Sequence, residues 1–171
     1  MADLIIGSSN IISTDSGTPT IQSGVSFPSG HIIQSIYNPT IASNSSNHTS
    51  EAVAASVTGQ ITITSGNGVL IYVQAGALYL DRDSGDMGFW VRIREGTTTS
   101  GTRLAAVTER HTAHPSNWHA NASLWAYDSS PADTTPDYCL TLERISSGAH
   151  YVRLNYTGAE YLKFFLFEVK Q

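Results

Sequence analysis

The chain has one cysteine, few charged residues and no long apolar run, and each shortage excludes a class of protein. The single Cys139 cannot form a disulfide within the chain, so a small scaffold held by disulfides is excluded. No stretch of about 18 apolar residues occurs, so we expect no membrane-spanning helix. Charged residues make up 13% of the chain and hydrophobic residues 40%, which is typical of a folded domain and not of a disordered one.

Basic residues are absent from the first half of the chain. No lysine or arginine precedes Arg82, and all nine basic residues lie from that position onward. Binding to nucleic acid requires clustered lysine and arginine to neutralise phosphates, so we expect no nucleic-acid partner. An almost uncharged segment can instead be buried against another protein without removing water from unpaired ions.

The spacing of apolar residues predicts an all-β domain over residues 30–171. In Phe89–Glu95 the apolar and polar side chains alternate, which places Phe89, Val91 and Ile93 on one face of a strand. Glycine, serine and proline cluster in the loops 81–88, 96–101 and 129–136. We predict strands near 31–37, 51–57, 60–64, 69–75, 78–80, 88–95, 102–109, 120–127, 138–145, 150–156 and 160–169, with one helical turn as the alternative for 51–57. Many short strands separated by frequent turns favour an antiparallel β-sandwich or jelly roll.

Residues 1–29 are predicted to form an extended N-terminal arm. Serine, threonine, glycine and proline dominate this segment, and its apolar residues are too widely spaced for a helix. We expect the apolar residues of the arm to anchor it on a protein surface; they are Leu4, Ile5, Ile6, Ile11, Ile12, Ile21, Val25 and Phe27.

Two predicted strands are apolar on both faces. In 160–169, Tyr161, Phe165 and Phe167 point to one side, while the residues between them are also apolar. Val69–Val73, which contains Tyr72, has the same character. One face of a sandwich strand should be wet in a soluble monomer, so either the arm or a loop covers the second face or another subunit does. We favour a subunit interface formed by Tyr72, Tyr161, Phe165 and Phe167.

Three short motifs resemble small structural proteins of tailed bacteriophages, notably marine and cyanobacterial phages. Thr20–Val25 followed by Phe27–Gln34 (FPSGHIIQ) is similar to the start of these proteins. Asp128–Tyr138 is similar to their late loop and strand, and Leu166–Val169 to their end. The resemblance implies a virion surface protein, often a homotrimeric jelly roll similar to the tumour necrosis factor fold, that acts as capsid decoration or as a fibre tip.

The sequence contains two weak candidates for a metal site. His111, His114 and His119 lie within nine residues, and three imidazoles can bind Zn²⁺ or Ni²⁺. Their irregular spacing around Pro115 favours a polar loop. The acidic segment 81–86 lacks the closing glutamate of a calcium loop. We therefore predict no metal and no cofactor.

No catalytic motif stands out either. A G-x-S-x-G nucleophile elbow is absent. Glu95, Glu109 and Glu143 lie on or near strands, but nothing in the sequence pairs them as a glycosidase requires. Cys139 lies on a strand and is predicted to be a buried apolar residue and not a nucleophile. We predict that the protein is not an enzyme.

One loop is a candidate ligand site. Trp118, Asn117 and His119 occur in a polar segment, and a tryptophan face can stack on a sugar ring. Trp125 and Tyr127 are expected to pack in the core, although they too could contribute to a sugar platform.

These observations together predict a non-catalytic virion protein that decorates or cements the phage capsid. Its expected partners are further copies of itself in a homotrimer, and the major capsid protein or another virion protein, which the arm would contact. The alternative is a receptor-binding fibre tip that recognises a glycan on the host surface.

Overall fold

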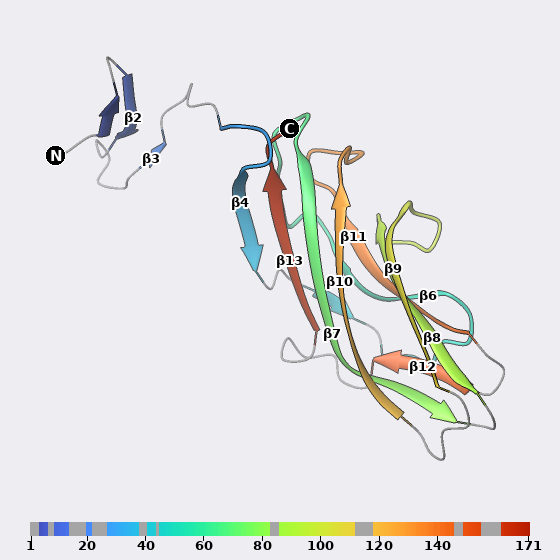
Figure 1. The fold of residues 1–171 in the computed structure, drawn as a ribbon. Helices are drawn as coiled ribbons and strands as arrows, with labels where there is room; N and C mark the ends of the chain where they lie inside the picture. Colours follow the sequence, from blue (N-terminus) through green and yellow to red (C-terminus); the bar gives the residue numbers. More distant parts are fainter. Residues whose placement is uncertain are drawn as a thin grey trace.

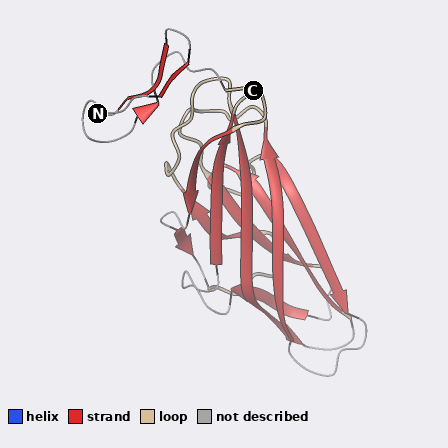
Figure 2. Cartoon of the chain, turned by 60° about the vertical axis from the view of Figure 1, so that its left-hand side comes forward, coloured by secondary structure: helices blue, strands red, loops and turns tan. Residues whose placement is uncertain are grey.

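A computed structural model describes residues 4–6, 9–13, 20–21, 27–37, 41–43, 45–82, 86–111, 118–145, 149–154 and 162–171. Within these residues the structure contains strands and no helix, as the sequence predicts (Figure 1). Two antiparallel five-stranded sheets pack face to face, and the long strands of each layer run side by side (Figure 2). The described residues accordingly include no helix that is long and apolar enough to cross a membrane.

The first sheet, called sheet I here, has the strand order β10-β7-β13-β4. Its strands are β4 (Ile32–Tyr37), β7 (Gly68–Arg82), β10 (Trp118–Asp128) and β13 (Leu162–Val169), and β12 (Ala149–Leu154) pairs with the far half of β7. The second sheet, sheet II, has the order β5-β6-β11-β8-β9. Its strands are β5 (Ile41–Ser43), β6 (Ala52–Val57), β8 (Met87–Glu95), β9 (Arg103–His111) and β11 (Tyr138–Arg144).

Several neighbouring strands in each sheet are distant in sequence, which is typical of a jelly roll. The first strand of the domain, β4, lies beside the last, β13, and β6 lies beside β11. The chain also changes sheet between β7 and β8, between β9 and β10 and between β10 and β11. The predicted antiparallel sandwich is thereby confirmed.

Alternating side chains build the core between the sheets. On β8, Phe89, Val91 and Ile93 are fully buried, as the alternation predicts. On β13, Phe164 and Leu166 are buried, while Phe165 and Phe167 on the opposite face are only partly buried. Burial of one large apolar side chain contributes roughly 1.5–3 kcal/mol, so these alternating rows hold the two layers together.

The structure corrects three predicted strand assignments. The predicted strands 69–75 and 78–80 are parts of one strand, β7. The pairing of β7 with β10 shifts register between Ala75 and Leu78, where the prediction leaves a break. On β7 the buried residues switch from odd to even numbers across that bulge. Residues 60–64 are not a strand, although Ile61 and Ile63 are buried. Gly59 turns the chain there with a φ of 59°. The strand predicted near 51–57 is confirmed as β6, and its alternative, a helical turn, is wrong.

The predicted arm contains short strands of its own. β1 (Leu4–Ile6), β2 (Ser9–Ser13) and β3 (Thr20–Ile21) form a three-stranded antiparallel sheet, so this segment is not one extended line. The side chains of Leu4, Ile5, Ile6, Ile11, Ile12 and Ile21 lie outside the described residues, as does Val25. Phe27 is described, and its ring lies 5.9 Å from that of His31.

Candidate binding face

A row of aromatic rings crosses four strands on the outer side of sheet I. In the ladder, Tyr37 on β4 lies opposite Phe165 on β13, Phe165 opposite Tyr72 on β7, and Tyr72 opposite Trp125 on β10. The ring centroids of successive partners are 4.6, 5.5 and 4.5 Å apart. Such distances are typical of favourable aromatic pairs. The strand register therefore builds a continuous aromatic surface from four separate segments.

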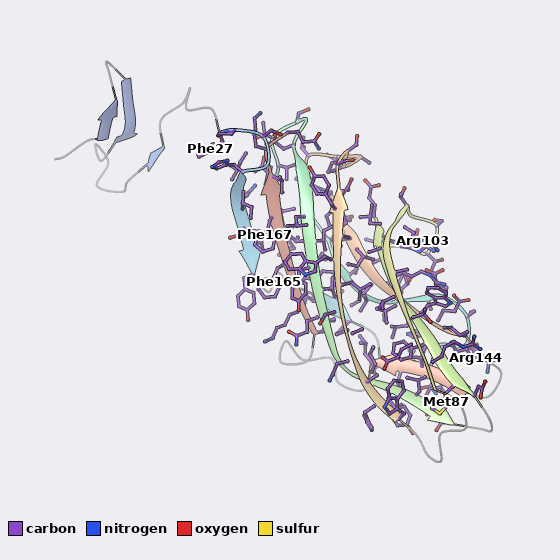
Figure 3. The ribbon with its side chains drawn as sticks, viewed as in Figure 1. Phe27, Met87, Arg103, Arg144, Phe165 and Phe167 are labelled. Carbon is purple, nitrogen blue, oxygen red and sulfur yellow. The ribbon has the colours of Figure 1, made fainter. Side chains whose placement is uncertain are left out.

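A second row extends this surface toward the end of β10. Phe167, Leu70 and Tyr127 lie opposite one another on β13, β7 and β10. Phe167 stacks 6.4 Å from both Phe165 and Trp125. Figure 3 shows Phe165 and Phe167 along β13. We call the two rows together the aromatic face; its members are Tyr37, Leu70, Tyr72, Trp125, Tyr127, Phe165 and Phe167.

The aromatic face is exposed in the described part of the chain. Tyr37 and Trp125 are each 58% exposed and Tyr127 is 46% exposed. No member carries a charge, and Lys163 on β13 is a charged residue at its border. Soluble monomers rarely leave large contiguous apolar patches open to water, and those that occur are often functional. This surface is therefore the main candidate for binding.

The structure brings most of the predicted interface residues together. Tyr72, Phe165 and Phe167 lie on the aromatic face, whereas Tyr161 lies outside the described residues. Tyr37 was not predicted from the sequence, and the prediction that Trp125 and Tyr127 pack in the core is wrong. Their exposure could have been found from alternation, because the small and apolar residues at even-numbered positions of β10 fill the core; these are Ala120, Ala122, Leu124 and Ala126.

The predicted ligand loop is not a loop at Trp118. This residue begins β10 on the inward side, packs partly buried against the core and lies 6.0 Å from the ring of Phe89. The prediction failed because the strand begins earlier than its polar composition indicates. His119 follows on the exposed side of β10, and Asn117 lies outside the described residues.

The predicted metal candidates fall mostly outside the described residues. His114 and the acidic positions 83–85 are not described, and neither is the side chain of His111. In the part of the chain that the structure does describe, no three histidine, cysteine, aspartate or glutamate side chains gather to hold a metal ion.

The outer side of sheet II carries an ion-pair network. Arg94 Nε donates to Glu51 Oε1 at 2.6 Å, and Arg92 lies between Glu51 at 3.4 Å and Glu143 at 2.6 Å. The pKa of Glu51 is lowered, chiefly by the hydrogen bond from Arg94. A carboxylate that is held ionised in this way cannot supply a proton as a general acid near neutral pH. The network is accordingly structural.

Glu168, on the last strand β13, accepts three hydrogen bonds that we call the buried clamp. It is 2% exposed, and it accepts hydrogen bonds from Gln34 Nε2 at 2.8 Å, from the Thr64 backbone N–H at 2.7 Å and from Asn67 Nδ2 at 2.7 Å. Burial would raise the pKa of this carboxyl, but the three donors outweigh it and the pKa is lowered. The clamp joins β13 to β4 and to the loop before β7.

The root of the arm is fastened at the same end of the sandwich. The Gly30 backbone N–H donates to the Lys170 carbonyl at 2.7 Å, and the Lys170 N–H donates to the His31 carbonyl at 2.8 Å. The chain therefore leaves the domain from a fixed point beside the C-terminus, as Figure 1 shows.

Cys139 is fully buried on the outer side of β11, beneath the loop that contains Thr98. Burial raises the pKa of its thiol to about 11. The prediction that this cysteine is a buried residue is confirmed.

Two clefts flank the loop 129–137. One of about 450 Å³ lies between residues 65–67, 129–134 and Gln171, and one of about 400 Å³ lies between that loop and residues 95–102. Serine and threonine hydroxyls and backbone groups form much of their lining. Small-molecule pockets are more often apolar with a few converging polar groups, which the more polar first cleft does not match.

Comparisons with known proteins leave the family open. No family model matches the chain, and no curated protein matches it. One of the solved structures with a similar arrangement is described as "CBM4 structure and function". The two chains share 10% sequence identity, and the alignment covers 92% of this chain and 82% of the other chain, with a TM-score of 0.29. A similarity this weak carries no argument, so the fold rests on the strand order and the function on the surface itself.

Proposed function

We propose that the protein is a non-catalytic structural subunit of a phage virion that self-associates through the aromatic face and decorates the capsid. The observation that carries this proposal is the aromatic face, where seven uncharged side chains form one surface on sheet I. A second copy of the chain is the occupant that suits it best, as a symmetric ring would hide this surface in every subunit.

The shape of the face favours a flat protein partner over a small ligand. Its rings contact one another across the sheet, while the two clefts described above lie elsewhere, beside the loop 129–137. Flat, closely packed apolar surfaces are typical of contacts between identical subunits.

The energy of such a contact is adequate. Covering a large, exposed apolar side chain contributes roughly 1.5–3 kcal/mol. Association costs about 4–15 kcal/mol in lost translational and rotational freedom. Three largely exposed rings from each subunit, with the partly buried members beside them, are of the order required to offset that cost.

Placement on a virion is supported by the resemblance of Phe27–Gln34 and Asp128–Tyr138 to segments of tailed-phage structural proteins, and by the arm. The arm has no basic residue, and its root is fastened beside the C-terminus by Gly30 and Lys170. A segment with no basic residue and only two acidic ones, leaving a rigid point, suits attachment along a capsid surface.

Two measurements test the proposal. Sedimentation of the purified chain should give a particle of about three subunits, and a stable single subunit at micromolar concentration would contradict self-association. Deleting residues 1–29 should abolish occupancy on virions while the remaining domain keeps its oligomeric mass. Undiminished occupancy would remove the arm from the proposal.

A fibre tip that binds host glycans is the second candidate. The exposed rings of Trp125 and Tyr127 favour it, since aromatic faces stack on sugars. The copy number on virions separates the two functions, because hundreds of copies indicate decoration and a few dozen indicate a fibre.

A further inference from the structure

An arginine lies over two adjacent tyrosine rings at the other end of sheet I, and the centroids of these rings are 6.0 Å apart. The guanidinium carbon of Arg153 on β12 is 4.9 Å from the ring centroid of Tyr79 on β7 and 5.6 Å from that of Tyr151. His119 on β10 meets Tyr79 edge-on at 5.3 Å. We call these four residues the arginine cluster. Its backbone is well supported, because Val152 and Leu154 on either side of Arg153 are fully buried.

Arg153 has no carboxylate partner among the residues that the structure describes. The ion pairs found there involve Arg92 and Arg94, which share Glu51 and Glu143. The Nε of Arg153 is buried and makes no hydrogen bond. The guanidinium carbon lies over both tyrosine rings. A guanidinium can donate paired hydrogen bonds to a planar, two-oxygen acceptor, and because Nε is buried, such a pair would come from the two terminal nitrogens.

The neighbours of Arg153 limit the charge of that acceptor. Tyr79 donates its hydroxyl to Asp81 Oδ1 at 3.2 Å, so one carboxylate already lies close to the cluster. The pKa of Tyr79 is raised, mainly by burial, and the hydroxyl remains a neutral donor near pH 7. A dianionic phosphate would be repelled by Asp81 more strongly than a singly charged carboxylate.

The cluster lies far from the point where the arm leaves. β12 pairs with residues 78–82 of β7, whereas β13 pairs with residues 68–75 and runs to the C-terminus beside the arm root. Figure 1 shows β12 at the end of the sandwich opposite the arm. A domain held by its arm would present this end outward, toward whatever the particle meets.

We propose that the arginine cluster binds a sugar that carries a carboxylate, such as a uronic acid in a host surface polysaccharide. The guanidinium of Arg153 forms paired hydrogen bonds with the carboxylate, and the rings of Tyr151 and His119 contact the sugar ring. This site goes beyond the proposed function, and it does not require self-association.

Titration calorimetry on the full chain tests the site, with oligogalacturonate as the probe. The fully methyl-esterified form of the same oligosaccharide has the same sugar rings without the charge, and acetate has the charge without the ring. We expect oligogalacturonate to bind at least roughly tenfold more tightly than either, because paired charge-assisted hydrogen bonds are lost with the ester.

Variants assign the binding to the cluster. Arg153→Gln should weaken binding roughly tenfold or more, Arg153→Lys should recover part of it, and Tyr151→Leu should weaken it while the charge remains. Arg103→Gln is the matched control, since it removes an exposed arginine from β9 on sheet II. Thermal unfolding verifies that each variant is folded.

Several outcomes would overturn the site. These are absence of binding, equal binding of the ester or of acetate, and binding unchanged in Arg153→Gln. Sedimentation of Arg153→Gln gives a further outcome that would overturn the site. If this variant separates the subunits and the parent chain binds no oligogalacturonate, the partner of Arg153 is a carboxylate of a sister subunit. Self-association through the aromatic face is judged separately by Phe165 variants, so either proposal can fail alone.

Discussion

Trp125 on β10 lies beside Tyr72 on β7 with ring centroids 4.5 Å apart, yet more than half of the tryptophan surface is open to water. The contact between the two rings and the pairing of β10 with β7 hold both side chains in place, although neither ring is buried in the core. An exposed surface of this kind gains free energy when a partner covers it, and it needs little rearrangement to do so.

Removing one ring from the middle of the aromatic face should weaken self-association. Phe165→Ser deletes the ring that touches both Tyr37 and Tyr72. We expect the dissociation constant of the assembly to rise at least about tenfold, which corresponds to roughly 1.4 kcal/mol of binding free energy. Analytical ultracentrifugation over a dilution series measures this shift.

Val107→Ser is the matched control for that experiment. Val107 is also an exposed apolar residue, but it lies on β9 in sheet II. The same shift in both variants would show a general loss of solubility or stability and would contradict a role specific to the aromatic face.

The adjacent residue Phe164 should affect folding and not recognition. It is fully buried between the sheets, on the opposite face of β13 from Phe165. Phe164→Ala should lower the free energy of unfolding by about 3–5 kcal/mol, because it removes buried apolar surface and leaves a cavity. Urea unfolding followed by fluorescence measures the loss, and a value below about 1 kcal/mol would contradict the assigned burial.

The buried clamp at Glu168 should make stability depend on pH in the acid range. The pKa of Glu168 is lowered in the folded chain. Its stabilising contribution is therefore fully present above the pKa of the unfolded carboxyl, about 4.3. This contribution is lost as the pH falls through the lower pKa of the folded state. Glu168→Gln should cost about 1–3 kcal/mol at pH 7, where it removes a charged acceptor of three hydrogen bonds. The difference from the parent chain should shrink toward pH 3.

Chemical denaturation at several pH values measures this convergence. Asp133→Asn removes an exposed carboxylate from the loop 129–137 and serves as the control. Parallel curves for Glu168→Gln and the parent chain from pH 7 to pH 3 would contradict an ionised clamp.

The thiol of Cys139 should be unreactive until the protein unfolds. It is fully buried, and its pKa of about 11 leaves almost no thiolate at pH 8. Ellman's reagent should label the folded protein only at the rate of unfolding, and should label it within seconds in denaturant. Full labelling of the folded chain within minutes would contradict the burial of this side chain.

Local patterns were sufficient to predict the fold class and most of the strands. The alternation in Phe89–Glu95 shows directly which residues face the core, because successive side chains on a strand must point to opposite sides. The same rule separated Phe164 from Phe165 on β13. Alternation could not reveal the bulge within β7 or the irregular course of residues 60–64, because partner strands decide both.

The amino-acid sequence by itself determined that the chain is a β-sandwich with two-faced apolar strands, a first third without basic residues and one buried cysteine. Only the tertiary structure decided that Tyr37, Tyr72, Trp125 and Phe165 form one exposed row, and that Arg153 lies over the adjacent rings of Tyr79 and Tyr151 with no carboxylate partner among the described residues. The reason is physical: side-chain alternation is set by neighbours in sequence, whereas a surface that crosses strands is set by the register of segments that are distant in sequence, such as those of Tyr37 and Phe165.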